Sequence, residues 1–202
     1  MSDTFRTILS PSEAVFTEKR SRFLAFAYPI ADVSEAKEKI AELGKKYFDA
    51  RHVCWAYMLG PDRTEFRAND NGEPSGTAGK PILGQINSFE LTNILIAVVR
   101  YFGGIKLGTS GLIVAYRQAA KEALENAEIV KRFVCEAITF SYPYMVMNDV
   151  MKLSKIDGVN IVSSQFDNTC SMTLSVRKSV MNHLLQRLKD IDGVSINNQN
   201  EI

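Results

Sequence analysis

Two glycine-rich segments carry the groups in this sequence that are best suited to binding an anion. The first runs from Asn69 to Pro81 and the second from Arg100 to Gly111, with an apolar run between them. Glycines let a backbone approach a ligand closely, and free N–H groups at a helix N-terminus suit a phosphate. The predicted anion contacts in these segments are Lys80, Arg100, Gly103, Gly104, Lys106, Gly108, Ser110 and Gly111. The competing interpretation is a tight strand-to-helix turn that needs glycine for its geometry alone.

Two familiar nucleotide-binding motifs do not fit these segments. A Walker loop needs a glycine five residues before Gly-Lys and a Ser or Thr after it. Here Pro74 stands in place of that glycine and Pro81 follows Gly79-Lys80. The second segment lacks the Gly-x-Gly-x-x-Gly spacing of dinucleotide-binding folds. We therefore predict no nucleotide-hydrolysing loop and no nicotinamide or flavin cofactor.

Four side chains are candidates for acid–base or nucleophilic chemistry. His52 and Cys54 share one face of an expected strand, but such neighbours project in parallel and no third group is identified to orient the histidine. Asp70 and Glu73 resemble a glycosidase carboxylate pair, although the Asn-Gly and Pro-Ser-Gly sequences around them are typical of turns. His183 is far from His52 in the sequence, so no metal site is predicted. We predict no catalytic residue; the residues expected to shape the loops, or to form a site there, are His52, Asp70, Gly72, Glu73, Gly76 and Gly79.

Hydrophobic periodicity predicts the elements that position these groups. The apolar run 93–102 is typical of a strand that is covered on both faces. Thr109 or Ser110 is expected to cap the helix that follows it. The other expected elements are a strand at 23–30, a helix at 33–48 capped by Asp32, a strand at 52–59 with a hairpin partner at 64–68, and a helix at 77–86 interrupted by Pro81.

A short internal repeat marks the second half of the chain. Ile156-Asp157-Gly158-Val159 recurs 35 positions later as Ile191-Asp192-Gly193-Val194. Each copy is expected to end a helix, with glycine as its C-cap, and to begin a strand. The expected order is strand 134–142, helix 143–156, strand 159–166, strand 170–176, helix 180–191 and strand 194–198. This is the βαββαβ order of a ferredoxin-like domain.

The composition is that of an ordinary globular protein. Of the 202 residues, 46% are apolar and 23% are charged, and the formal net charge is +1, so any polyanion contact must come from a local basic patch. Cys54, Cys135 and Cys170 are odd in number and lie in apolar runs, which indicates reduced, packed thiols. We expect no signal peptide and no transmembrane helix, and hence a cytoplasmic protein.

Three motifs in order resemble the YigZ/IMPACT family: Arg51–Tyr57, Asn71–Leu83 and Val99–Gly108. The resemblance implies an α+β fold of two domains. Residues 1–130 would form an IMPACT-type domain, an α/β sandwich similar to ribosomal proteins and to domain IV of elongation factor G. Residues 131–202 would form a ferredoxin-like domain similar to domain V of that factor. The chain departs from the family pattern at Val114, where arginine is common, and at Arg117, where glycine is common, so the family's basic surface is not carried over there.

The resemblance also implies a role in translation or its regulation. The favoured hypothesis is a non-enzymatic protein that contacts RNA, the ribosome or a translation-linked protein partner through Arg51 and the two glycine-rich segments. The alternative is an enzyme that acts on a small phosphorylated or peptide substrate in a cleft between the same loops. A third possibility is a protein–protein adaptor, which would expose an apolar patch without basic neighbours.

Overall fold

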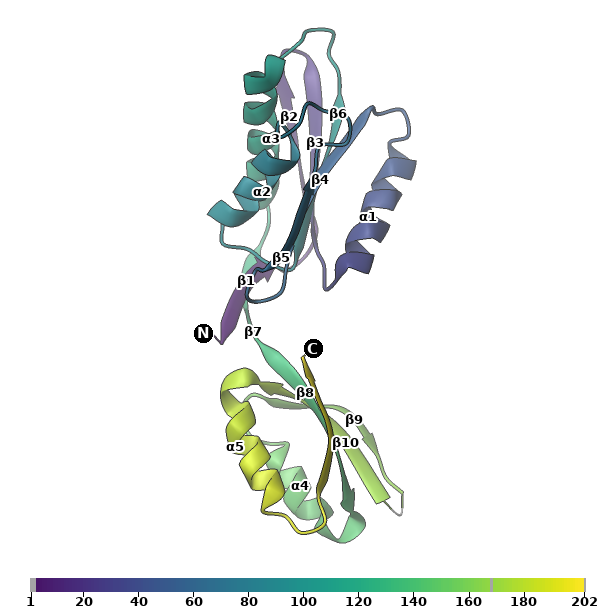
Figure 1. Cartoon of the computed structure of the whole chain (residues 1–202), viewed down its shortest axis with the longest axis vertical. Coiled ribbons are helices and arrows are strands. Elements are labelled where there is room, and N and C mark those ends of the chain that lie inside the picture. Colours follow the sequence, from purple (N-terminus) through teal and green to yellow (C-terminus); the bar gives the residue numbers. More distant parts are fainter. Residues whose placement is uncertain (1–2, 168, 202) are drawn as a thin grey trace. The chain divides into compact units, whose positions relative to one another are not determined.

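The computed structural model describes residues 3–167 and 169–201. They form two compact units, which are described here one at a time (Figure 1). The N-terminal unit comprises residues 5–132, and the C-terminal unit comprises residues 133–201 with Asp3 and Thr4. The predicted α+β class with two domains is confirmed. Among the described residues, no helix combines the length and apolarity needed to cross a membrane.

The N-terminal unit is built on a five-stranded sheet in which all neighbouring strands are antiparallel. Its spatial order is β2 (Ser12–Glu18), β3 (Ser21–Pro29), β6 (Ile94–Tyr101), β4 (His52–Leu59) and β5 (Glu65–Asn69). A separate pair of strands consists of β1 (Thr4–Ile8) and β7 (Ile129–Phe133). Neither β1 nor β2 is predicted from the sequence. Strand β1 is short, and the apolar residues Ala14, Val15 and Phe16 of β2 are consecutive in the sequence, although their burial alternates.

Helices cover both faces of this sheet (Figure 1). One face carries α1 (Val33–Lys46), and the other carries α2 (Gly79–Ser88) and α3 (Gly108–Glu125). The central strand β6 therefore buries side chains in both directions. Ile96 and Val98 pack toward α2 and α3, whereas Ala97 and Val99 belong to the core cluster that holds Leu43 of α1. This confirms the predicted strand covered on both faces and explains its unbroken apolar run.

The three helices of this unit begin in different ways. Asp32 caps α1 as predicted, because its Oδ1 accepts hydrogen bonds from the N–H groups of Ser34 and Glu35. Pro81 lies in the first turn of α2, where a missing N–H costs nothing, so the expected interruption is wrong. Helix α3 begins at Gly108 after Leu107, with no side-chain cap, so the expected cap by Thr109 or Ser110 is also wrong.

The C-terminal unit has the predicted ferredoxin-like βαββαβ order, with the sheet order β11-β8-β10-β9. Both of its helices pack on one face over the apolar core. Gly158 and Gly193 have φ values of 85° and 81°, but they lie in the turns beyond the helix ends and not at the expected C-caps. The elements are β8 (Cys135–Pro143), a 3-10 turn (Tyr144–Val146), α4 (Met147–Leu153), β9 (Val159–Gln165), β10 (Thr169–Arg177), α5 (Lys178–Lys189) and β11 (Ser195–Glu201).

Candidate functional site

A buried ion pair joins the two glycine-rich segments. Arg100 follows Val98 in the alternation of β6, so its side chain points toward α3 and is only 7% exposed. A buried guanidinium requires a counter-charge. Glu73, from the first segment, supplies it by accepting a hydrogen bond of 2.6 Å from Arg100 Nη1 and another of 2.8 Å from the Tyr116 hydroxyl. The pair therefore fixes the first loop against both β6 and α3.

Cys54 and Tyr116 continue this network into the core. The Cys54 thiol donates to the carbonyl of Asp70 over 2.8 Å and lies 3.3 Å from the Tyr116 hydroxyl. Burial raises the pKa of the Cys54 thiol to about 12 and also raises the pKa of Tyr116. The thiol is therefore protonated at neutral pH, and the expected packing role of Cys54 agrees with its full burial.

Asp70 organises the first glycine-rich loop and caps α2. Its carboxylate accepts backbone hydrogen bonds from Gly76 at 2.7 Å, Ala78 at 2.9 Å and Gly79 at 2.8 Å. Burial by itself raises the pKa of Asp70, but these three N–H donors and the nearby Lys80 outweigh burial and lower that pKa overall. All the strong interactions of this carboxylate are thus with its own loop.

Close contacts account for two of the predicted glycines. A Cβ atom at Gly103 would lie 2.0 Å from the carbonyl carbon of Arg20, so the connection from β6 to α3 touches the turn between β2 and β3. Gly72 has a φ of 84°, and a Cβ atom there would lie 3.2 Å from His52 Nδ1. That nitrogen is 2.8 Å from the carbonyl oxygen of Asn71. Both glycines therefore have a geometric role.

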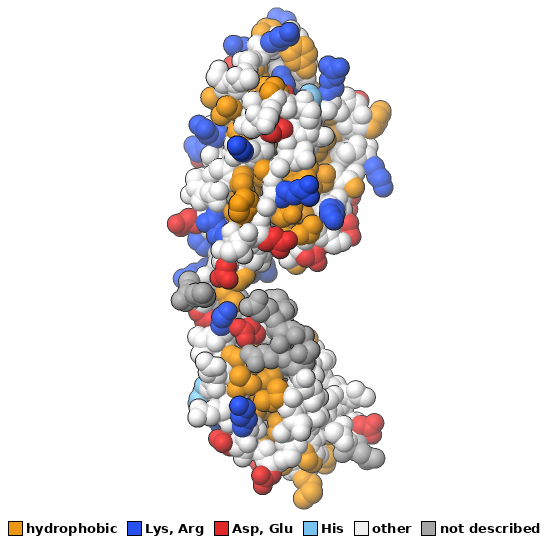
Figure 2. Space-filling view, in the orientation of Figure 1, with side chains coloured by type: hydrophobic (Ala, Val, Ile, Leu, Met, Phe, Trp, Pro, Cys, Tyr) orange, Lys and Arg blue, Asp and Glu red, His pale blue; other side chains and the backbone are white. Residues whose placement is uncertain are grey.

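A cavity of about 390 Å³ opens where the two glycine-rich segments meet. The ion pair of Glu73 and Arg100 forms its buried part, while Arg51 and Lys106 are exposed at its rim. Figure 2 shows Lys and Arg side chains beside apolar ones at the end of the N-terminal unit drawn at the top. The cavity is lined by Arg51, His52, Glu73, Pro74, Arg100, Phe102, Lys106, Leu107, Gly108, Thr109 and Leu112.

The N-terminus of α3 lines this cavity through Leu107, Gly108 and Thr109. The first turns of α1 and α2 are capped by the carboxylates of Asp32 and Asp70, whereas among the described residues no side chain caps α3. In addition, Arg100 Nε is buried and finds no acceptor within the described part of the chain. An anion in the cavity would meet the helix N-terminus, Lys106 and Arg51 together.

The predicted contacts are thus divided between several places. Arg51, Arg100, Lys106 and Gly108 line the cavity, whereas Ser110, Gly111, Gly103 and Gly104 are absent from its lining. Lys80 lies in a neighbouring depression between α2 and α3 together with Gly76 and Arg117, the residue at which the chain departs from the family pattern. Of the loop-shaping residues, His52 and Glu73 reach the cavity, and Gly79 packs against the backbone of Asn69.

Sequence reasoning missed the apolar wall of the cavity. Phe102, Leu107 and Leu112 line it, and Phe102 is 54% exposed although it follows a buried strand. The signal that was available is the position of Phe102 directly after the end of β6, between Arg100 and Lys106. An exposed aromatic side chain flanked by cations marks a surface for a ligand with both charged and planar parts.

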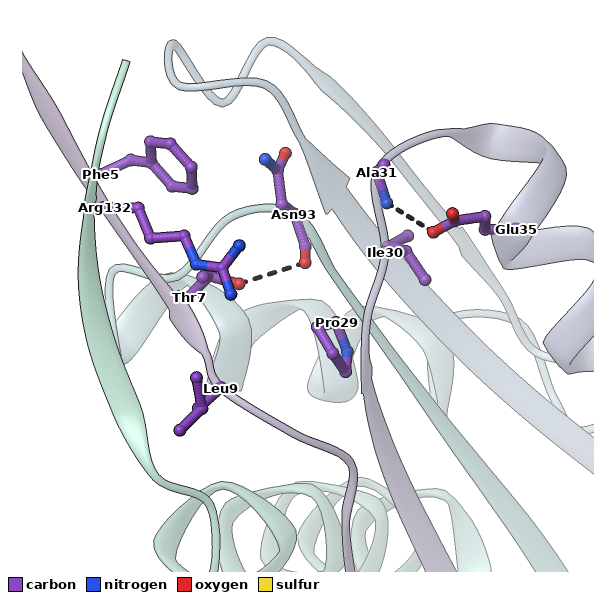
Figure 3. Close-up of a pocket in the computed structure, with 9 residues that line it drawn as sticks. All are labelled: Phe5, Thr7, Leu9, Pro29, Ile30, Ala31, Glu35, Asn93 and Arg132. Carbon is purple, nitrogen blue, oxygen red and sulfur yellow. Dashed lines mark hydrogen bonds between the residues drawn. The ribbon is translucent and has the colours of Figure 1, made fainter. Parts of the chain in front are cut away.

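A second cavity, of about 290 Å³, lies beside β1 and the start of α1 (Figure 3). Its polar groups bond to one another: the Thr7 hydroxyl donates to the carbonyl of Asn93 over 3.2 Å, and the Ala31 N–H donates to Glu35 over 2.8 Å. Arg132 is the one cation among its lining residues. This cavity therefore has fewer positively charged groups to bind an anion than the cavity at α3.

Across residues 3–167 and 169–201, no group of three or more His, Cys, Asp or Glu side chains could hold a metal ion.

Known proteins match the chain over the segments that build the α3 cavity. The family model described as the Impact N-terminal domain matches residues 19–124, more than half of the chain. IMPACT family member YigZ of Escherichia coli is 30% identical over 93% of each chain. The chain belongs to the IMPACT family. An IMPACT family member of Haemophilus influenzae is 32% identical over 86% of each chain. A crystal structure of a hypothetical protein superposes with a TM-score of 0.76 and 27% identity, over 100% of this chain and 98% of the other.

Removing Glu73 should cost much of the stability of the N-terminal unit. In Glu73→Ala, Arg100 stays buried without a counter-charge, and loss of one partner of such a pair costs about 3–5 kcal/mol. Urea unfolding of the full chain, followed by the fluorescence of Trp55, the single tryptophan, reports on this unit. Glu125→Ala is the matched control, because its pair with Lys121 is about half exposed and should contribute less than about 1 kcal/mol. Equal losses in the two variants would contradict the role of Glu73.

Asp70 should make the stability of this unit depend on pH in the acid range. Its folded-state pKa lies below the ordinary value of 3.8, so its ionised form stabilises the fold above that pH. The stabilisation is lost as the pH falls through the lowered folded-state pKa. We expect Asp70→Asn to lose about 2 kcal/mol at neutral pH, with a difference from wild type that narrows as the pH falls below about 4. Parallel pH profiles for the two proteins, measured by urea unfolding, would exclude this role.

Proposed function

We propose that this protein is a non-enzymatic binding protein associated with translation, and that it contacts RNA phosphates through the cavity at the N-terminus of α3. Membership of the IMPACT family supports the association with translation, which the sequence resemblance implies. The observation that carries the RNA contact is the N-terminus of α3, which lines the same cavity as the exposed cations Arg51 and Lys106.

Phosphate suits this cavity for two physical reasons. The positive end of an eighteen-residue helix and its free N–H groups favour an anion. Arg51 and Lys106 add two exposed positive charges, while the charge of Arg100 is already balanced by Glu73. The balanced pair leaves the rim with a net attraction for a polyanion, even though the whole chain has a net charge of only +1.

Three of the four acid–base candidates of the enzymatic alternative are engaged in internal contacts. The Cys54 thiol is buried and its pKa is raised, Asp70 is bonded to three backbone N–H groups, and Glu73 is paired with Arg100. His52 does reach the cavity, but its Nδ1 contacts a backbone carbonyl in place of a carboxylate. These engaged side chains favour a binding role over acid–base catalysis.

The adaptor hypothesis requires an apolar patch without basic surroundings. The exposed side chains of Phe102 and Ile105 are instead neighbours of Lys106 in the sequence, and Phe102 shares the cavity wall with Lys106 and Arg51. A basic surface with aromatic residues is more typical of nucleic-acid binding. The surface around the cavity therefore supports an RNA contact more strongly than an apolar protein interface.

Loss of the two rim cations should weaken RNA binding and its dependence on salt. We expect the double variant Arg51→Ala/Lys106→Ala to bind a fluorescein-labelled RNA hairpin with single-stranded flanks about tenfold more weakly than wild type at about 50 mM salt. Each lost phosphate contact should also reduce the slope of log K against log salt by about one. Fluorescence anisotropy of the full chain at several salt concentrations measures both quantities.

The matched control removes the same number of charges elsewhere on the N-terminal unit. Arg67 lies on β5 and Lys121 in the C-terminal half of α3, and both are exposed outside the cavity lining. Arg67→Ala/Lys121→Ala should keep both the affinity and the salt slope of wild type. The proposal fails if wild type does not bind RNA at low salt, or if the two double variants weaken binding equally.

A further inference from the structure

The wall of the cavity at α3 includes apolar side chains that a phosphate group alone would not contact. Pro74, Phe102, Leu107 and Leu112 contribute apolar side chains to the lining that also holds the rim cations. Inorganic phosphate, or the phosphate of a closed duplex, would leave these side chains in contact with water. A ligand that fills the cavity therefore carries a planar or apolar group within about one nucleotide length of its anionic group.

Phe102 is held in a position to stack against such a group. Its ring centroid lies 5.7 Å from the guanidinium carbon of Arg100, which is itself fixed by Glu73. Phe102 nevertheless remains 54% exposed and lines the cavity. The ring thus has a buried cation near one side and accessible surface on another, an arrangement that suits stacking with a base.

We infer that the RNA bound at this site is single-stranded, with one unpaired base stacked on Phe102 and its phosphate at the N-terminus of α3. This inference rests on the proposed RNA contact and adds to it the form of the RNA. In a duplex the faces of the bases are covered by their neighbours, so a base can stack on a protein aromatic only where the strand is unpaired. The volume of about 390 Å³ accommodates a group of about one nucleotide.

A strand that continues past the cavity meets further basic groups. Lys80 and Arg117 line the depression between α2 and α3. Some lining residues of the two cavities are neighbours in the sequence: Pro74 and Leu112 line the cavity, and Gly76 and Ile113 line the depression. Successive phosphates of an extended strand would therefore find cations on both sides of the turn at Pro74–Gly76.

The test compares a single-stranded RNA 12-mer with a blunt duplex of the same sequence, using fluorescence anisotropy of the full chain at low salt. We expect the single strand to bind at least tenfold more tightly than the duplex. Phe102→Ala should weaken single-strand binding about tenfold, the scale of one base–aromatic stack. A 2-aminopurine base placed in the strand should change its fluorescence on binding to wild type and not on binding to Phe102→Ala.

Two further variants separate stacking from folding and from general exposure. Phe102→Leu keeps apolar packing against Arg100 but has no aromatic face, so it should fold and still lose the stack. Phe66→Ala is the matched control, because Phe66 on β5 is 57% exposed and lies outside the cavity lining; it should bind as wild type does.

The outcomes distinguish this inference from the proposed function. The inference is overturned if the single strand and the duplex bind equally well, or if Phe102→Ala and Phe102→Leu both bind the single strand with wild-type affinity. In either case the proposed RNA contact stands if binding still depends on Arg51 and Lys106. If wild type binds neither RNA, both are overturned.

Discussion

The structure of the N-terminal unit depends on the need to neutralise one buried arginine. Arg100 follows the alternation of the central strand into the interior, where an unpaired guanidinium would be strongly destabilising. Glu73 meets this need from a loop 27 residues earlier in the chain, and Tyr116 of α3 bonds to the same carboxylate oxygen. One ion pair thereby fixes the loop, the strand end and the helix that surround the cavity.

This pairing separates charges that hold the fold from charges that remain available. Asp70, Glu73 and Arg100 form internal hydrogen bonds. The cavity lining also holds Arg51, Lys106 and the first residue of α3, whose helix start has no capping side chain among the described residues. A site of this kind can bind an anion through groups that are not needed to hold the fold. Its exposed Phe102 then decides which form of polyanion fits best.

Local pattern was sufficient to predict much of the fold. The unbroken apolar run of β6, the Asp32 cap and the repeat around Gly158 and Gly193 indicated a doubly covered strand, a helix start and the ferredoxin-like order. Pairing of Glu73 with Arg100 could not be predicted, because it depends on how a loop folds back over 27 residues. Strand β2 was missed because its apolar residues Ala14, Val15 and Phe16 are consecutive in the sequence, although their burial alternates. Phe102 was missed because a single aromatic residue directly after an apolar strand is also typical of a longer strand.

The most direct test of this account is an NMR titration of the full chain with inorganic phosphate. We predict shifts of the Gly108 and Thr109 amide signals, because no side chain in the described part of the chain caps the N-terminus of α3. The Ser34 and Glu35 amides at the start of α1 serve as the internal reference, since Asp32 already accepts their hydrogen bonds, and they should stay in place. Unshifted Gly108 and Thr109 signals, or equal shifts at the start of α1, would contradict an anion site at α3.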